Sequence, residues 1–320
     1  MTGAPVLAVE GLRVALRRTG VALVSDVGFT VARGETLALL GESGCGKSLT
    51  GQAIMGLLPA ELAASGTIRF QGRALPLGDA RAMHGLRGSR IGMVFQNPRA
   101  SLDPLMTVGA QVAEVLAFHT VTPPADRRAR AKALLADVGI ADAAACLTAY
   151  PHELSGGMCQ RVAIAMAIAC EPALLIADEA TTALDPTVQR QILDLLRSLQ
   201  ARNGMAIVLI THDLGVVADA ADRVAVLYAG EVVERAPVAE AFALPAHPYT
   251  RALLRAVPRL DVAQARFEAI PGQVPAADAM PAGCRFAPRC VLADAACAAP
   301  PPLHALAPER IARCWYAEAA

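Results

Sequence analysis

The sequence predicts an α/β protein with a mainly parallel sheet and a helical insertion. Short apolar segments alternate with helical ones over much of the chain, which is typical of a parallel sheet. A glycine-rich turn at residues 41–48 directly follows one of the apolar segments and precedes a helical one. Residues 98–169 have few strand signals and a helical composition, so they are expected to form the insertion.

Hydrophobic periodicity predicts strands at residues 7–16, 29–31, 36–40, 91–95, 174–177, 206–210 and 224–228. A helix is expected from about residue 47 to residue 58, where Pro59 would stop it. Prolines become frequent after about residue 236, and such a segment needs something other than regular secondary structure to hold it. We expect one domain over residues 1–245, with its helical subdomain at about 97–170, and an extension over 246–320.

Composition and charge argue against two classes of protein. The mean hydropathy of +0.41 would suit a membrane protein, but a spanning helix needs about 18 to 20 apolar residues. The best run, residues 162–170, is bounded by Arg161 and Glu171. The 29 basic residues balance 29 acidic ones, so the footprint of a nucleic-acid partner is missing. With no secretion signal at the N-terminus, we expect a cytoplasmic protein.

Residues 41–48 match the phosphate-binding pattern G-x-x-x-x-G-K-S in full. The glycines let backbone N–H groups turn toward a phosphate, Lys47 would reach the β- and γ-phosphates, and the Ser48 hydroxyl would ligate Mg²⁺. The alternative is an ordinary glycine-rich turn, but the strand before it and the helix after it favour a nucleotide site. The expected ATP-binding residues are Gly41, Glu42, Ser43, Gly44, Cys45, Gly46, Lys47, Ser48 and Leu49.

A buried strand at residues 174–177 ends in two carboxylates, Asp178 and Glu179. Ionised groups at the edge of a core must be paired or must coordinate a metal. Beside a phosphate loop, Asp178 would hold Mg²⁺ through water, and Glu179 would polarise the attacking water as a general base. Taken alone, the two carboxylates would equally suit an acidic strand end near a helix.

The segment Leu154-Ser155-Gly156-Gly157 makes the resemblance specific. With the two motifs above, the chain resembles an ATP-binding subunit of an ATP-binding cassette (ABC) transporter, a P-loop ATPase. The resemblance implies that Ser155, Gly156 and Gly157 close over the γ-phosphate bound by an opposite subunit, so that two ATPs lie in a dimer interface. A capping turn is the alternative interpretation of the same three residues, and the other motifs argue against it.

Three further positions match the family. Gln96 corresponds to the Q-loop glutamine, implied to touch Mg²⁺ and to sense the membrane subunits, and Ala183-Leu184-Asp185 matches the D-loop. His212 matches the switch histidine that contacts the γ-phosphate and takes part in hydrolysis. One position departs from the pattern, because Leu16 stands where many members stack an aromatic ring on adenine.

Residues 150–158, 95–104 and 247–254 resemble the dipeptide, oligopeptide and nickel importer ATPases. The resemblance implies an ATP hydrolase that energises import of di- or oligopeptides from the cytoplasmic face of the inner membrane, as a peripheral subunit. Its implied partners are a second ATPase subunit, two membrane permease subunits and an extracytoplasmic solute-binding protein. Two alternatives remain: the same machinery importing nickel or another small solute, and a soluble cassette ATPase acting on nucleic acid or the ribosome.

Four cysteines are spaced C-x5-C-x6-C-x16-C near the C-terminus: Cys284, Cys290, Cys297 and Cys314. Four thiolates can bind Zn²⁺ or a 4Fe-4S cluster. The loops of five and six residues favour the larger cluster, and the resemblance also implies iron and sulfur. Zinc and four unrelated reduced cysteines are the alternatives. We expect a structural metal site that staples the proline-rich tail.

Overall fold

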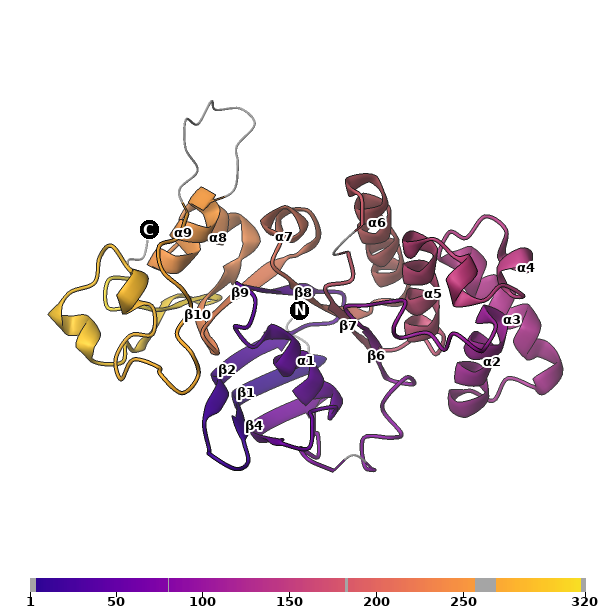
Figure 1. Cartoon of the computed structure of the whole chain (residues 1–320), viewed down its shortest axis with the longest axis horizontal. Helices are drawn as coiled ribbons and strands as arrows, with labels where there is room; N and C mark the ends of the chain where they lie inside the picture. Colours follow the sequence, from indigo (N-terminus) through magenta and orange to yellow (C-terminus); the bar gives the residue numbers. More distant parts are fainter. Residues whose placement is uncertain (1–3, 80, 182–183, 257–268, 318–320) are drawn as a thin grey trace. The chain divides into compact units, whose positions relative to one another are not determined.

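The computed structural model describes residues 4–79, 81–181, 184–256 and 269–317 (Figure 1). The chain divides into two compact units whose segments interleave along the sequence. The first unit holds residues 1–6, 31–35 and 79–210, and the second holds residues 7–30, 36–78 and 211–320. The expected domain boundary near residue 245 stays a prediction.

The first unit contains three buried parallel strands and most of the helices. Strand β7 (Leu174–Asp178) pairs in parallel with β6 (Ile91–Val94) on one side and β8 (Ala206–Thr211) on the other. All three are buried along their whole length and, apart from Asp178 and Thr211 at their ends, contain no polar side chain, as expected for parallel strands covered on both faces. The helices are α2 (Val108–His119), α3 (Pro124–Asp137), α4 (Ala143–Cys146), α5 (Gly156–Ile168) and α6 (Pro186–Asn203), with a short 3₁₀ turn, η1 (Pro151–Glu153). The helical composition predicted for residues 98–169 is therefore confirmed.

The second unit contains an antiparallel group of strands and the phosphate loop. One sheet has the order β2-β1-β4-β5, built from β1 (Leu7–Leu16), β2 (Ala22–Val31), β4 (Leu62–Phe70) and β5 (Arg73–Ala74). In addition, β3 (Thr36–Leu40) pairs in parallel with β9 (Arg223–Tyr228). Helix α1 (Lys47–Met55) follows β3 through the glycine-rich turn, and α7 (Leu214–Ala220) precedes β9.

The C-terminal part of the second unit contains short strands and helices, and those beyond residue 246 are separated by irregular segments. Strand β10 (Glu231–Pro237) pairs antiparallel with β9 and with β12 (Arg310–Arg313), which itself pairs with β11 (Leu303–Ala307). Helices α8 (Val238–Ala243) and α9 (Pro248–Ala256) and two 3₁₀ turns, η2 (Ala287–Arg289) and η3 (Ala295–Ala298), complete this part. In Figure 1 the last segments of the chain, coloured yellow, lie beside β10.

Two predictions need correction. The strand pairing is mixed rather than mainly parallel, because β1, β4, β10, β11 and β12 all pair antiparallel. Helix α1 ends at Met55, before Pro59, because Gly56 adopts a left-handed conformation (φ 62°) and its N–H bonds back to the carbonyls of Gln52 and Ala53. Among the described helices, none is long and apolar enough to cross a membrane.

The core of the second unit explains how its C-terminal part is attached. Strands β3 and β9 pack against buried residues of α8 and α9, and the rings of Tyr228, Tyr249 and Phe286 join that core. These rings lie 4.7 to 5.4 Å apart between centroids, in tilted or edge-on pairs. Aromatic pairs of this kind contribute about 0.5–1.5 kcal/mol each beyond their buried area. Residues from both ends of the sequence therefore share one core.

Candidate nucleotide site

The predicted site residues divide between the two units, and each group is described within its own unit. The phosphate loop and His212 belong to the second unit. Gln96, the Ser155–Gly157 segment, Asp178, Glu179 and Asp185 belong to the first.

The phosphate loop requires glycine at two positions for different reasons. A Cβ on Gly41 would lie 2.2 Å from the carbonyl oxygen of Leu227 in β9 and 2.8 Å from the Cys45 sulfur, so no side chain fits. Gly46 has φ 100° and caps α1, and a Cβ there would lie 2.8 Å from Val24. The loop is thus pressed against neighbouring backbone, and its turn uses a conformation that glycine adopts at little cost.

Lys47 is buried, with 5% of its surface exposed. Its ammonium group donates hydrogen bonds to the carbonyl oxygens of Gly41 (2.7 Å) and Glu42 (3.0 Å) in its own loop. A buried ammonium group is costly unless it is paired, and neutral carbonyls compensate it less well than phosphate oxygens would. Burial also raises the pKa of the Cys45 thiol, although the neighbouring Lys47 charge lowers it. The buried ammonium group of Lys47 therefore gives the loop a positive charge that can bind an anion.

In the first unit, β7 ends at the buried carboxylate of Asp178, which is 4% exposed. The next residue, Glu179, has φ 47°, a left-handed conformation that is unusual for a residue other than glycine. Its backbone N–H donates to the carbonyl of Ile210 (2.9 Å). Strain of this kind costs about 1–3 kcal/mol and collects at functional sites. The strand end therefore turns Glu179 away from the direction an extended strand would give it.

Gln96, which follows β6, lies next to Glu179. Its side-chain amide donates a hydrogen bond of 2.8 Å to a carboxylate oxygen of Glu179. Because β6 and β7 are parallel neighbours, residues after their carboxyl ends meet at the same edge. The sequence placed both residues in the site, and the structure brings them together.

The predicted Ser155–Gly157 segment lies at the start of α5. Ser155 is the N-cap residue of this helix, and its hydroxyl oxygen accepts a hydrogen bond from the Met158 N–H (3.3 Å). Ser155 and Gly156 are exposed, whereas a Cβ on Gly157 would lie 3.0 Å from Val188 of α6. The capping turn considered as an alternative is thus present. A helix N-terminus with an exposed hydroxyl also has the geometry of an anion receptor.

Asp185 is the N-cap residue of α6. Its carboxylate accepts hydrogen bonds from the N–H groups of Thr187 (3.1 Å) and Val188 (3.0 Å), and Pro186 occupies the first helical position. Ala183 of the predicted D-loop lies outside the described residues. Asp185 therefore has a clear structural role, and its contact with nucleotide stays a prediction.

His212 is exposed and directly follows β8, as the sequence predicts. The next residue, Asp213, caps α7 by accepting hydrogen bonds from the N–H groups of Gly215 (2.7 Å) and Val216 (3.3 Å). Leu16, the candidate position beside adenine, ends β1 and is half-buried. The structure thus presents His212 at a strand end, and nothing in it assigns a base-stacking residue.

The cysteine quartet does not form the expected metal site. Among the described residues, which include all four thiols, no group of three or more His, Cys, Asp or Glu side chains lies where it could hold a metal ion. The sulfurs of Cys290 and Cys314 each accept a backbone N–H, from Leu292 and Tyr316, at 3.4 Å. Burial raises the pKa of the Cys284, Cys290 and Cys314 thiols. The structure therefore supports neither a 4Fe-4S cluster nor zinc as a staple.

Ion pairs and strand pairing attach the C-terminal part instead. Arg285 pairs with Glu231 (3.1 Å), Arg313 pairs with Asp26 (2.6 Å), and β12 pairs with β10. Two residues of this part contact the phosphate loop, Tyr249 and Arg289, and neither is among the site residues that the sequence predicts. Tyr249 lies in the segment 247–254 that resembles the family, which is a sequence signal for its importance.

These features together define a nucleotide-binding cassette of the P-loop ATPase class. A family model described as ABC transporter matches residues 24–182. A second model, described as the C-terminal region of oligopeptide/dipeptide transporters, matches residues 233–297.

Individual proteins that resemble this chain agree with the two family models. The chain is 47% identical over 330 residues to a protein of Brucella abortus, with 98% of each chain covered, and 46% identical over 314 residues to another, with 97% and 95% covered. Both are named as candidate peptide import ATP-binding proteins. The chain therefore belongs to the ATP-binding subunits of ABC transporters.

Two solved structures have a similar fold. One is cbiO1 of Clostridium perfringens, part of the ABC transporter complex cbiONQ, at 33% identity and a TM-score of 0.65, covering 75% of this chain and 91% of that one. The other is a dimeric ATP-binding cassette in a post-hydrolysis state with ADP and phosphate, at 28% identity and a TM-score of 0.64, covering 72% and 98%.

Proposed function

We propose that this chain is the ATP-hydrolysing subunit of an ABC importer for di- or oligopeptides. The observation that carries the proposal is the match of residues 233–297 to the C-terminal region of oligopeptide/dipeptide transporters. The Brucella relatives, which cover nearly the whole chain and carry a peptide-import name, support the same cargo. The cassette provides the energy, and the membrane subunits with their solute-binding protein would select the peptide.

ATP binds at the phosphate loop in this proposal. The ammonium group of Lys47, which the carbonyls of Gly41 and Glu42 hold in place, donates charge-assisted hydrogen bonds to phosphate oxygens. The remaining loop residues surround the phosphates with backbone N–H groups.

The proposed ligands of Mg²⁺ are Ser48, Gln96 and Asp178. They offer a hydroxyl, an amide oxygen and a carboxylate, which are the oxygen donors that this ion prefers. When bound, Mg²⁺ neutralises charge on the phosphate oxygens.

Glu179 is the proposed general base. Its carboxylate accepts the proton of the water that attacks the γ-phosphorus, and His212 stabilises the γ-phosphate. In the structure, Gln96 donates a hydrogen bond to this same carboxylate. Gln96 therefore holds Glu179 in place and also competes with water for it, so a movement of Gln96 would control when the base is available. Such coupling suits a residue that senses the membrane subunits.

Two such cassettes are proposed to act together, each closing its Ser155–Gly157 segment over the nucleotide of the other. The exposed N-terminus of α5 has the N–H groups and the hydroxyl to receive a phosphate. Closing and opening of the pair would move two membrane permease subunits between conformations. The subunit would lie at the cytoplasmic face of the membrane, and an extracytoplasmic solute-binding protein would deliver the cargo.

Uptake by the reconstituted transporter tests this proposal. The chain is co-expressed with its membrane subunits, placed in proteoliposomes with ATP inside, and supplied with peptide-loaded solute-binding protein and a labelled dipeptide or pentapeptide. We expect ATP-dependent uptake of peptide, and no uptake by the matched complex that carries Glu179→Gln.

The same vesicles separate the alternatives. Uptake of ⁶³Ni²⁺ without uptake of peptide would show that the cargo is nickel rather than peptide. Recovery of the native protein with ribosomes or DNA, and not with membrane subunits, would contradict an importer altogether.

A further inference from the structure

The second residue of the phosphate loop, Glu42, is held from the C-terminal part of the chain. Both guanidinium NH groups of Arg289 donate to its carboxylate, at 2.7 and 3.0 Å, in a two-point ion pair. The backbone N–H of Glu42 donates to the phenol oxygen of Tyr249 at 3.0 Å. Side chain and backbone of one loop residue are therefore both restrained by residues more than 200 positions away.

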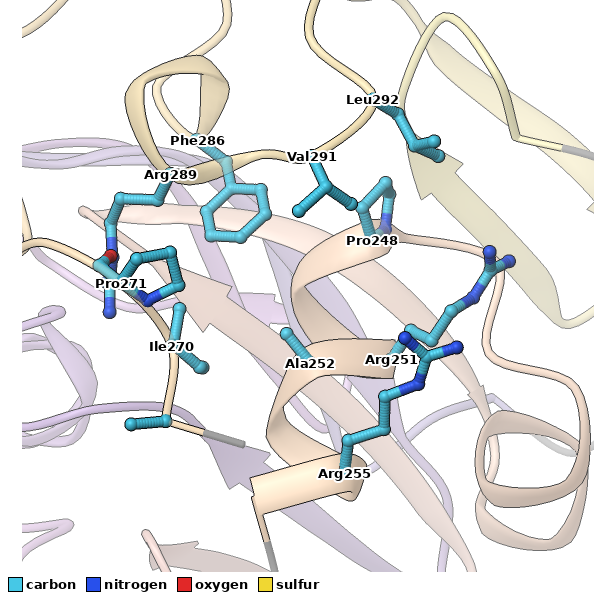
Figure 2. Close-up of a pocket in the computed structure, with 11 residues that line it drawn as sticks. Pro248, Arg251, Ala252, Arg255, Ile270, Pro271, Phe286, Arg289, Val291 and Leu292 are labelled. Atoms are coloured by element: carbon cyan, nitrogen blue, oxygen red, sulfur yellow. The ribbon is translucent and has the colours of Figure 1, made fainter. Parts of the chain in front are cut away.

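Arg289 is itself fixed before it reaches the loop. Its side chain is 3% exposed, its Nε donates to the carbonyl of Pro271 (2.8 Å), and its guanidinium carbon lies 5.6 Å from the centre of the Tyr228 ring. Figure 2 shows Arg289 running alongside Pro271, next to Phe286, at the edge of a pocket of about 410 Å³. The bonds to Glu42 raise the pKa of Arg289 above its ordinary value. A bidentate pair held this way loses little side-chain entropy.

Tyr249 is fixed equally well. It is fully buried on α9, against the rings of Tyr228 and Phe286. Its backbone N–H donates to Nδ1 of His247 (3.0 Å). The buried carboxylate of Glu234 accepts the N–H groups of Ala246 (2.8 Å) and His247 (2.9 Å), which sets the start of this helix.

The restraint on Glu42 also affects Lys47, whose ammonium group would bind phosphate. The carbonyl oxygen of Glu42 accepts a hydrogen bond from Lys47, and so does the carbonyl of Gly41 before it. A shift of the Glu42 peptide would therefore shift the partners of the Lys47 ammonium group. Groups that are already in place bind more tightly, because the ligand does not have to order them.

We infer that Arg289 and Tyr249 are positioning residues for nucleotide binding, and that the C-terminal extension is thereby part of the ATP site. Neither residue touches the reacting atoms. Both act through Glu42, whose place in the loop they set. The inference rests on the proposed function, since it takes MgATP as the ligand of the loop.

The test measures the affinity of the full-length chain for a fluorescent ATP analogue with Mg²⁺. Arg289→Gln and Glu42→Gln should each weaken binding about tenfold, equivalent to about 1.4 kcal/mol. The double variant should be no weaker than either single variant, because the two side chains act through one pair. In the assembled transporter, KM for ATP should rise by a similar factor while kcat changes less than about twofold.

The matched control is Arg313→Ala. Arg313 belongs to the same extension and also makes an ion pair, with Asp26 of β2, but that pair does not involve the loop. We expect it to lower the melting temperature and to leave nucleotide affinity unchanged. Equal affinities of Arg289→Gln and wild type would overturn the inference, and so would equal losses in Arg289→Gln and Arg313→Ala. Failure of the wild-type chain to bind MgATP would instead defeat the proposed function.

Discussion

The phosphate loop and the C-terminal extension are stabilised in different ways. The loop is built from eight consecutive residues, and Lys47 bonds to carbonyls within five or six positions of itself. The extension is held by residues that are distant in sequence: Arg289 reaches Glu42 across 247 positions, and Arg313 reaches Asp26 across 287. The bonds of Lys47 are therefore local, whereas the attachment of the extension, including its contacts with Glu42, depends on the packing of the whole unit.

This difference predicts different consequences for substitutions. A change within the loop should affect nucleotide binding and leave the rest of the unit folded. A change in the core under the extension should loosen several contacts at once, including those that hold Glu42.

Phe286→Ala should have the largest effect on stability. The ring is 3% exposed and contacts Tyr228, Tyr249 and His247. Removing a buried aromatic side chain typically costs about 3–5 kcal/mol. Chemical denaturation should show that loss, with weaker binding of MgATP as the Tyr249 contact loosens. A loss below about 1 kcal/mol would show that the extension does not depend on this aromatic core.

Gly41→Ala should have the largest effect on nucleotide binding. The new Cβ would lie 2.2 Å from the carbonyl oxygen of Leu227, which is backbone and cannot rotate away. We expect affinity for MgATP to fall about 100-fold, or about 2.7 kcal/mol, while the protein stays folded. Gly34→Ala is the control, because Gly34 also has positive φ (70°) but open space around it. Unchanged binding in Gly41→Ala would contradict the described loop.

Because His247 is buried, we expect the free energy of unfolding to depend on pH. Burial lowers its pKa from 6.5 to about 3, so the folded state holds it neutral. The unfolded chain binds this proton below about pH 6.5, so the stability is fully present above that pH and is lost as the pH falls toward 3. At pH 5.5 the loss should be about 1 kcal/mol relative to pH 7.5.

His247→Asn provides the comparison for that effect, since the amide oxygen can still accept the Tyr249 N–H. The stability difference between wild type and this variant should shrink as the pH falls from 7.5 to 5.5. A difference that is the same at both pH values would show that His247 also takes up a proton in the folded state.

Arg130→Ala should have the smallest effect. Its ion pair with Glu171 (3.2 Å) joins side chains that are 39% and 66% exposed, so water and salt screen the charges. We expect a change in the free energy of unfolding within about 0.5 kcal/mol. A larger loss would mean that exposed ion pairs contribute more to stability in this protein than screening by water and salt allows.

Local sequence patterns predicted the local part of this molecule. The strand before the loop, the position of Lys47, and the neighbouring strand ends that carry Gln96 and Glu179 all depend on short segments, and the structure has them in place. Helix α1 was predicted about three residues too long, because a left-handed Gly56 ends it before Pro59 does.

Long-range contacts could not be predicted in the same way. The spacing of the four cysteines and the family resemblance predicted a metal site, but spacing does not state where the sulfurs lie in space, and the described residues show no such site. Half-buried positions alternate with exposed ones in β11 and with buried ones in β12. This alternation is short and follows a proline-rich segment, so the sequence did not predict either strand. The pair between Arg289 and Glu42 requires the folded core to bring its partners together.

The most direct test of the account is nucleotide-dependent dimerisation of the Glu179→Gln variant. Light scattering would follow its mass with and without MgATP, alongside the rate of phosphate release. We predict that ATP produces a stable dimer, and that turnover falls at least about 100-fold, because binding is intact and the general base is missing. Phosphate release at the wild-type rate would contradict the role of Glu179 and with it the mechanism proposed for this subunit.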